Sequence, residues 1–229
     1  MTPERFQKLR TILSRRQPDL AVLADDVHKA HNLAAIIRTC DAVGIPKVHL
    51  CDPDIRARQL RGRSMGSNRW VEVEQYDNIV TAGQKLKDAG FKVIAAHFSD
   101  KAKPYHELDY TGPCALLMGA EKKGVSKEGA ELADEHVIIP MQGMVQSFNV
   151  SVAAGIILME AQRQRQAAGL YDRNQIPSSE YTSTLFRWSY PELARYCDDR
   201  NLNYPKLDEE GQLIQPDVWY EQIRANTSD

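Results

Sequence analysis

Short apolar runs along this chain alternate with longer segments in which apolar residues recur every three or four positions. The short runs predict strands at 20–23, 47–51, 71–75, 92–98, 114–118 and 136–140. The helical spacing between them predicts helices from Asn32 to about Gly44, from Asn78 to Ala89 and from Asn149 to about Gln166. Strands that alternate with helices predict an α/β fold, in which a parallel sheet carries helices on both faces.

Two of these strands point to a ligand site. Runs 114–118 and 136–140 are almost continuously apolar, which is typical of strands buried on both faces. Each is followed by a loop rich in glycine and polar residues, GAEKKGVSKE and MQGMVQSFN. Because ligands of open α/β sheets bind beyond the carboxyl ends of the strands, we expect a cofactor at these two loops.

The two ends of the chain follow other patterns. Phe6, Leu9, Ile12 and Leu13 lie at helical spacing and predict the buried face of an N-terminal helix that ends before Pro18. After Gly169 the sequence becomes polar, with short helices expected at 191–200 and 216–225. The sequence therefore predicts an N-terminal helix in 1–18, an α/β domain in 19–168 and a helical C-terminal extension in 169–229.

The amino-acid composition limits the classes of protein to which this chain can belong. The 229 residues are 42% hydrophobic and 26% charged, as in ordinary globular proteins, and no apolar run approaches the ~18 residues of a membrane span. We expect a cytoplasmic protein whose four widely spaced cysteines are reduced and mostly buried. The formal net charge of −2 hides two stretches without acids, 5–16 and 56–69, each with five basic residues, and such local basic density suits a polyanionic partner.

The sequence lacks the motifs that are typical of several enzyme classes. The chain has no GxxxxGK[ST] phosphate-binding loop, no GxGxxG after its first strand, and no metal-ligand spacing among its six histidines. Nucleoside triphosphatases, dehydrogenases and zinc enzymes are therefore disfavoured, and no metal is expected at the site.

Three segments in fixed order carry a family resemblance. They are HNLAAIIRT at 31–39 with AVG at 42–44, MGAEKKGV at 118–125, and IPM at 139–141 through VQSFNVS at 145–151. Each resembles one of the three signature motifs of the SpoU (TrmH) family of SPOUT methyltransferases. The flanking segments RRQPDL, VHKAHN and EAQRQR resemble the subfamily that methylates guanosine 18 in the tRNA D-loop.

The resemblance implies both an activity and an architecture. The expected reaction transfers a methyl group from S-adenosylmethionine to the ribose 2′-hydroxyl of a tRNA guanosine. The expected fold is of SPOUT type, with a deep C-terminal trefoil knot that holds the cofactor. Topology rules alone would make a knot very rare, so this expectation rests on the resemblance. Members of the family form homodimers whose active site uses both subunits, and we expect the same here.

The resemblance also implies a catalytic set, namely Arg38, Asn32, Glu121, Ser147 and Asn149. A guanidinium stays protonated, so Arg38 is expected to stabilise the developing alkoxide or to hold a phosphate, and the general base is left open. Each residue also has a plain structural alternative. Arg38 suits a surface pair with Asp41, Glu121 suits a solvated charge or helix cap, and the other three suit helix caps.

Cofactor binding in this family relies largely on backbone groups. By resemblance we assign it to Ala96, His97, Gly119, Ile139, Met144 and Phe148. His97 is equally compatible with an ordinary strand-end histidine.

For RNA, the candidate contacts are Arg10, Arg15, Arg16, His31, Arg63, Arg163 and Arg165. Phosphate contacts of this kind give affinity without sequence reading, and solvated surface is their alternative.

Two rival functions remain open. One is ribose methylation of rRNA or of another tRNA position, although rRNA members of the family commonly carry a separate N-terminal RNA-binding domain. The other is a protein that holds S-adenosylmethionine and RNA without catalysis. The intact set of five catalytic residues argues against this second rival.

Overall fold

The computed structural model describes residues 1–52 and 69–226, the last five of these by backbone alone. The chain divides into two compact units. Residues 16–173 form the first, here called the sheet unit. Residues 1–15 and 174–229 form the second, here called the terminal unit, so the two ends of the chain belong together.

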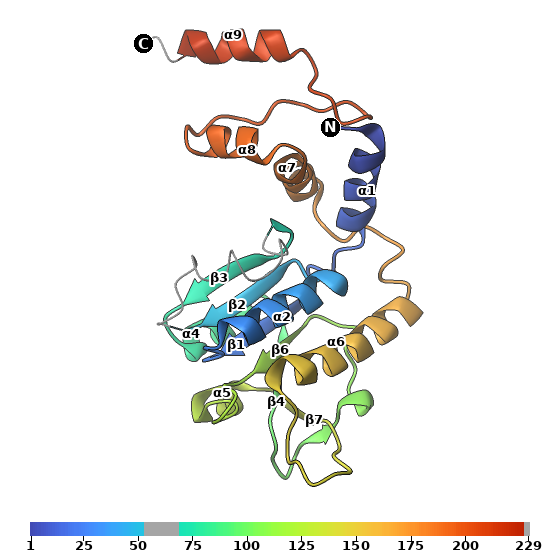
Figure 1. The fold of residues 1–229 in the computed structure, drawn as a ribbon, viewed down its shortest axis with the longest axis vertical. Helices are drawn as coiled ribbons and strands as arrows, with labels where there is room; N and C mark the ends of the chain where they lie inside the picture. Colours follow the sequence, from blue (N-terminus) through green and yellow to red (C-terminus); the bar gives the residue numbers. More distant parts are fainter. Residues whose placement is uncertain (53–68, 227–229) are drawn as a thin grey trace. The chain divides into compact units, whose positions relative to one another are not determined.

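The sheet unit is built on a seven-stranded sheet in the order β3-β2-β1-β6-β4-β7-β5 (Figure 1). All six strand pairings are parallel, and Val22 of β1 lies opposite Val48 of β2 and Leu116 of β6. The strands are β1 (Leu20–Asp25), β2 (Lys47–Cys51), β3 (Glu72–Tyr76), β4 (Lys92–Ala96), β5 (Lys103–Pro104), β6 (Cys114–Met118) and β7 (Glu135–Ile138). The predicted parallel α/β sheet is thus confirmed.

Helices cover both faces of this sheet. On one face lie α2 (Ala30–Ala42) and α6 (Val150–Ala167), which pack against each other. On the other lie α4 (Ile79–Asp88) and α5 (Lys127–Leu132). Both faces of β1 carry apolar side chains that must be shielded from water. Val22 packs in the core on the side of α2 and α6, whereas Leu23 packs in the core on the side of α4. A short 3-10 helix, η2 (Tyr105–Glu107), contacts α6.

Helix boundaries agree with the sequence prediction except at one important place. Asn78 and Asn149 cap α4 and α6 by accepting backbone N–H groups, as expected of N-cap residues. Helix α2, however, begins at Ala30, with Lys29 as its N-cap. The prediction that Asn32 caps this helix is therefore wrong, because the preceding residues add most of a turn. Asn32 lies inside the helix and is buried, which leaves its side-chain amide for other contacts.

Four helices belong to the terminal unit: α1 (Pro3–Ser14), α7 (Ser178–Ser189), α8 (Pro191–Asp198) and α9 (Pro216–Asn226). Three residues of the predicted apolar face of α1, Phe6, Leu9 and Leu13, are buried, but the fourth, Ile12, is exposed. Helix α1 packs on α7, and α7 packs on α8. The rings of Phe186 and Tyr204 stack with their centroids 4.6 Å apart, which ties α7 to the chain beyond α8.

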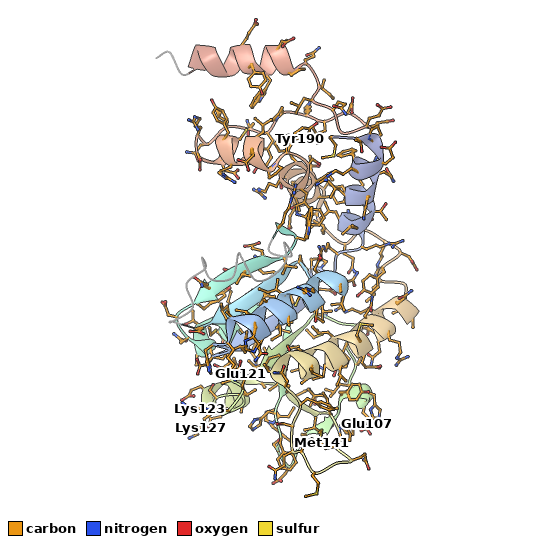
Figure 2. All side chains as sticks on the ribbon, viewed as in Figure 1. Glu107, Glu121, Lys123, Lys127, Met141 and Tyr190 are labelled. Carbon is orange, nitrogen blue, oxygen red and sulfur yellow. The ribbon has the colours of Figure 1, made fainter. Side chains whose placement is uncertain are left out.

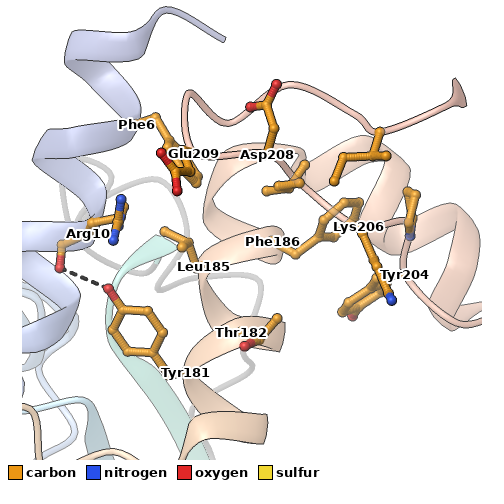
Figure 3. A pocket seen from close by; sticks show the side chains of 13 residues that line it. Phe6, Arg10, Tyr181, Thr182, Leu185, Phe186, Tyr204, Lys206, Asp208 and Glu209 are labelled. Atoms are coloured by element: carbon orange, nitrogen blue, oxygen red, sulfur yellow. Dashed lines mark hydrogen bonds between the residues drawn. The ribbon is translucent and has the colours of Figure 1, made fainter.

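The terminal unit also encloses a cavity of about 770 Å³ (Figure 3). Phe6, Leu185 and Phe186 form an apolar wall, and Arg10 and Glu209 also line the cavity. Across it, the Tyr181 hydroxyl donates to the main-chain oxygen of Arg10 at 3.3 Å. Of the predicted site residues, this cavity contains Arg10 alone.

Three further expectations concern membrane spans, the cysteines and the knot. No helix in the described ranges is long and apolar enough to cross a membrane. All four cysteines are buried and unpaired, as predicted. The trefoil knot stays a prediction.

Candidate active site

A cavity of about 850 Å³ opens at the carboxyl ends of β4, β6 and β7 in the sheet unit. Both predicted ligand loops contribute to its wall, in agreement with the rule for open α/β sheets. Its volume lies in the range of small-molecule sites. All six residues assigned to the cofactor line it, namely Ala96, His97, Gly119, Ile139, Met144 and Phe148. Their role in binding stays a prediction.

The loop after β6 can close only because it contains Gly119. A Cβ atom at this position would lie 2.1 Å from the carbonyl carbon of Gly124 and from the nitrogen of Val125, far inside contact distance. The Gly124 N–H donates to the oxygen of Ala120 at 2.8 Å, and Gly124 has a left-handed φ of 69°. The backbone therefore folds back on itself beside the cavity, which brings main-chain groups to its wall.

The β4 edge of the cavity carries a histidine held in its neutral form. The ring of His97 meets the ring of His136 edge-on, with centroids 5.2 Å apart. Burial, together with His136 and Lys101, lowers the pKa of His97 below its ordinary value. A neutral ring suits a mostly apolar wall that would take an uncharged aromatic group.

A chain of polar side chains connects the first predicted loop, which follows β6, with α2 and α6. The Asn32 amide donates to Glu121 Oε1 at 2.6 Å, and the Asn149 amide donates to Asn32 Oδ1 at 3.2 Å. Asn149 Oδ1 in turn accepts from the backbone N–H and the hydroxyl of Ser151. Three of the five predicted catalytic residues, 89 and 117 positions apart in sequence, thus form one network.

Glu121 joins this network to the cavity, because it also lines the cavity wall. It is one of the residues labelled in Figure 2. Burial on its own would raise the pKa of Glu121, but the Asn32 hydrogen bond, a backbone hydrogen bond and the charges of His28 and Lys29 outweigh it and lower that pKa. Glu121 is therefore a carboxylate at neutral pH, able to accept hydrogen bonds and to attract cations.

The other two predicted catalytic residues lie apart from the network. Ser147 is exposed and lines the cavity. Arg38 is exposed on α2 and is not among the residues that line the cavity. Within the described part of the chain, Arg38 makes no ion pair with Asp41, so the alternative of a local surface pair finds no support.

Two arginines assigned to RNA are structural instead. Arg165 is 0% exposed, and its guanidinium donates to Asp19, Gln17 and the main-chain oxygens of Tyr110 and Gly112. Arg16 is 1% exposed and donates to Asp41 and the main-chain oxygen of Ile45. The prediction that these two side chains contact phosphates is wrong, because their donors are buried and directed at protein oxygens.

The remaining RNA candidates stay accessible. Arg10 and Arg15 are exposed at α1 and its end, and His31 is exposed on α2. Arg163 is exposed on α6 and makes an ion pair with Glu160. Arg63 lies outside the described residues.

The sequence reasoning missed two lysines. Lys122 and Lys123 line the cavity directly after Glu121, and Lys123 is labelled in Figure 2. The signal was present, since both belong to the second motif, but a basic pair in a loop is ordinarily read as solvated surface. No cluster of His, Cys, Asp and Glu among the described residues has the geometry to hold a metal ion.

Comparison with known proteins identifies the family. Residues 19–159 match the model of the SpoU rRNA Methylase family, and residues 163–216 match the model described as SpoU, rRNA methylase, C-terminal. The chain is 44% identical over 227 residues to a tRNA (guanosine(18)-2'-O)-methyltransferase of Escherichia coli, covering 98% of this chain and 99% of that one. It is 48% identical to the protein of that name from Thermus thermophilus, covering 82% of this chain and 96% of the relative.

Solved structures agree with these matches. The structure described as A. aeolicus TrmH/SpoU tRNA modifying enzyme superposes with a TM-score of 0.77 at 42% identity, covering 83% of this chain and 97% of that chain. Together with the family model, which spans more than half of the sequence, these likenesses show that the chain belongs to the SpoU methylase family.

Proposed function

We propose that this protein transfers a methyl group from S-adenosylmethionine to the ribose 2′-hydroxyl of a tRNA guanosine, guanosine 18 of the D-loop. The proposal rests on one observation. Glu121 lines the cavity at the strand ends and also belongs to the hydrogen-bond network with Asn32 and Asn149. The names of the E. coli and T. thermophilus relatives supply the nucleoside and its position. Because the substrate is tRNA, we place the reaction in the cytoplasm.

The residues at the cavity fit S-adenosylmethionine. Gly119 keeps the wall free of a side chain at the point where the backbone folds back, and Ala96, Ile139 and Phe148 offer an apolar surface for an adenine ring. The cofactor, when bound, supplies an electrophilic methyl group on a sulfonium. Glu121 places a carboxylate at the wall, where it can attract a positive charge.

The protein's own contribution to the reaction is positioning and electrostatics. The 2′-hydroxyl is a poor nucleophile until negative charge develops on its oxygen, so a fixed donor or cation nearby lowers the barrier. The Asn149 and Asn32 amides are held in one orientation by Glu121 and by the start of α6. Arg38 would add a permanent cation that stabilises the alkoxide or grips the adjacent phosphate.

We also propose a homodimer, whose interface includes the outer face of α6. Val152 and Met159 of α6 are exposed, and Met159 is 54% accessible. With Ile156 and Gly155 they line an apolar hollow of about 510 Å³. Exposed apolar side chains gathered on one helix are typical of a protein interface. A second copy would also allow Arg38 to reach an active site that it does not line in its own chain.

For the tRNA itself, we retain Arg10, Arg15, His31 and Arg163 as proposed contacts. Their side chains are exposed, and cations on the surface bind phosphates with a strong dependence on salt. Arg163 would have to exchange its Glu160 partner for a phosphate.

A methylation assay tests the proposal. The protein is incubated with unmodified tRNA and methyl-labelled S-adenosylmethionine, and the labelled nucleoside is mapped after nuclease digestion. A tRNA with adenosine in place of guanosine 18 is the matched control. We expect label as 2′-O-methylguanosine at position 18 in the first substrate and none there in the control. Label in a base, in rRNA alone or in no RNA would reject the proposal.

A further inference from the structure

His28 is the one group in the described structure with a ring nitrogen directed at the catalytic network from outside it. It precedes α2 in the loop that follows β1, and its Nδ1 atom lies 3.5 Å from Glu121 Oε2. The flanking segment VHKAHN contains His28, but neither the three signature motifs nor the cavity lining includes it.

Glu121 leaves a place for such a partner. Its Oε1 atom accepts the Asn32 amide, but its Oε2 atom is buried and accepts no hydrogen bond from any described residue. A buried carboxylate oxygen without a donor is costly, so the nearest donor has a large effect on where the carboxylate sits. Among the described hydrogen bonds and ion pairs, the donor closest to this oxygen is the Nδ1 atom of His28, 3.5 Å away.

The loop before α2 fixes which ring nitrogen carries the proton. The main-chain oxygen of Asp26 lies 3.0 Å from the backbone nitrogen of His28 and 3.2 Å from its Nδ1. A carbonyl oxygen only accepts, so Nδ1 must carry a hydrogen in both the neutral and the charged ring. This single Nδ1–H is shared between two acceptors, the Asp26 oxygen at 3.2 Å and Glu121 Oε2 at 3.5 Å. Asp26 itself has a left-handed φ of 55°, a conformation that non-glycine residues adopt rarely and that is often kept at functional sites.

We infer that His28 is a positioning residue for methyl transfer: its Nδ1–H holds the free oxygen of Glu121 and so fixes Asn32 and, through it, Asn149. This inference rests on the proposed function, because it concerns the same site. The order of contacts is Asp26 carbonyl, His28, Glu121, Asn32, Asn149. No atom of His28 needs to touch the substrate.

Two substitutions separate this role from simple support of the fold. His28→Ala removes the donor, whereas His28→Asn keeps an N–H donor close to the position of Nδ1. Removal of a hydrogen bond to a charged group corresponds to a roughly tenfold to hundredfold effect, so we expect kcat for tRNA methylation to fall by this factor in His28→Ala. In His28→Asn we expect most of kcat to return, with KM for tRNA and affinity for S-adenosylmethionine unchanged in both variants.

The pH profile gives an independent readout. The charged groups that act on Glu121 are His28 and Lys29, and both lower its pKa. Without His28 this pKa rises toward its ordinary value. Activity that depends on the carboxylate is lost as pH falls through that pKa, so the acid limb of log kcat should move to higher pH in His28→Ala. Thermal melting of both variants checks that the fold is intact.

Three outcomes would overturn the inference. They are an unchanged kcat in His28→Ala, an equal fall of kcat in His28→Asn, or a raised KM for tRNA with kcat intact, which would make His28 a substrate contact. A wild-type protein that methylates no tRNA ribose would instead reject the proposed function, so the two failures are distinguishable.

Discussion

Arg163 and Arg165 show that residue type alone does not predict whether an arginine side chain is exposed to RNA. Both lie near the end of α6 and both were expected to face RNA, yet Arg165 is completely buried and Arg163 is exposed. Their separation of two positions on a helix turns them to different sides. The partners of Arg165 are Asp19 and Gln17, near the start of β1, and only the fold brings residues 146 and 148 positions apart into contact.

We predict opposite outcomes for the two arginines when each is replaced by methionine. Arg165→Met leaves the Asp19 carboxylate and three main-chain oxygens short of donors, and should lower the free energy of unfolding by about 3–5 kcal/mol. Arg163→Met should leave it almost unchanged, because the ion pair with Glu160 is exposed. Urea unfolding measures both. Equal destabilisation of the two variants would contradict the structural role of Arg165.

Gly119 carries a second prediction at this scale. In Gly119→Ala the new methyl group would lie 2.1 Å from backbone atoms of the same loop, so the loop must open. We expect affinity for S-adenosylmethionine to fall roughly tenfold or more, the effect of 1–3 kcal/mol of overpacking. Calorimetric titration measures it. Gly112→Ala is the control, because its Cβ would meet nothing within 4 Å. Unchanged binding in Gly119→Ala would remove this loop from the cofactor site.

At the scale of elements, the periodic spacing of apolar residues correctly predicted the strands and helices that have a strong local pattern. Both central strands and the helices α4 and α6 lie where the spacing put them, and Gly44 and Gly90 end helices in the left-handed conformation. Helix α7 was missed because serines and threonines, which have low helix propensity, occupy much of its exposed side, while Leu185 and Phe186 pack inward. Helix α5, with six residues, is too short for a periodic signal.

Helix α1 and its end carry a prediction about RNA. Arg10 and Arg15 are exposed and lie in a stretch without acids, so we expect the double variant Arg10→Ala/Arg15→Ala to weaken tRNA binding. The slope of log K against log salt should become shallower by about one for each phosphate that the variant no longer binds. Filter binding at several salt concentrations measures this. Lys87→Ala, a surface lysine paired with Asp134, is the control. An unchanged slope would exclude α1 from the RNA interface.

At the scale of the whole molecule, the site is assembled from segments that are distant in sequence. The rule for parallel sheets predicted that the loops after β6 and β7 would meet, and they share one cavity. The same rule says nothing about rotamers, so the hydrogen bonds among Glu121, Asn32 and Asn149 could not be derived from the pattern. The position of Arg38 outside the cavity was equally hidden, because periodicity places a residue on a helix face and says nothing about which cavity its side chain lines.

The proposed homodimer makes a prediction of its own. Met159→Glu places a charge on the exposed apolar face of α6, where an interface would have to bury it without a partner. We expect the mass in solution to move from twice 25.9 kDa toward 25.9 kDa. Light scattering after gel filtration measures this. Gln166→Glu adds the same charge at an exposed position near the end of α6 and should leave the mass unchanged. A wild-type monomer, or a dimer that tolerates Met159→Glu, would contradict this interface.

The central claim is that one cavity brings the sulfonium methyl group beside the Glu121–Asn32–Asn149 network. A crystal structure of the protein with S-adenosylmethionine tests it most directly. We predict density for the cofactor among the loops that follow β4, β6 and β7, with its methyl group facing the end of the cavity where Glu121 lies. Cofactor density elsewhere, or a methyl group turned away from Glu121 and Asn149, would contradict the claim.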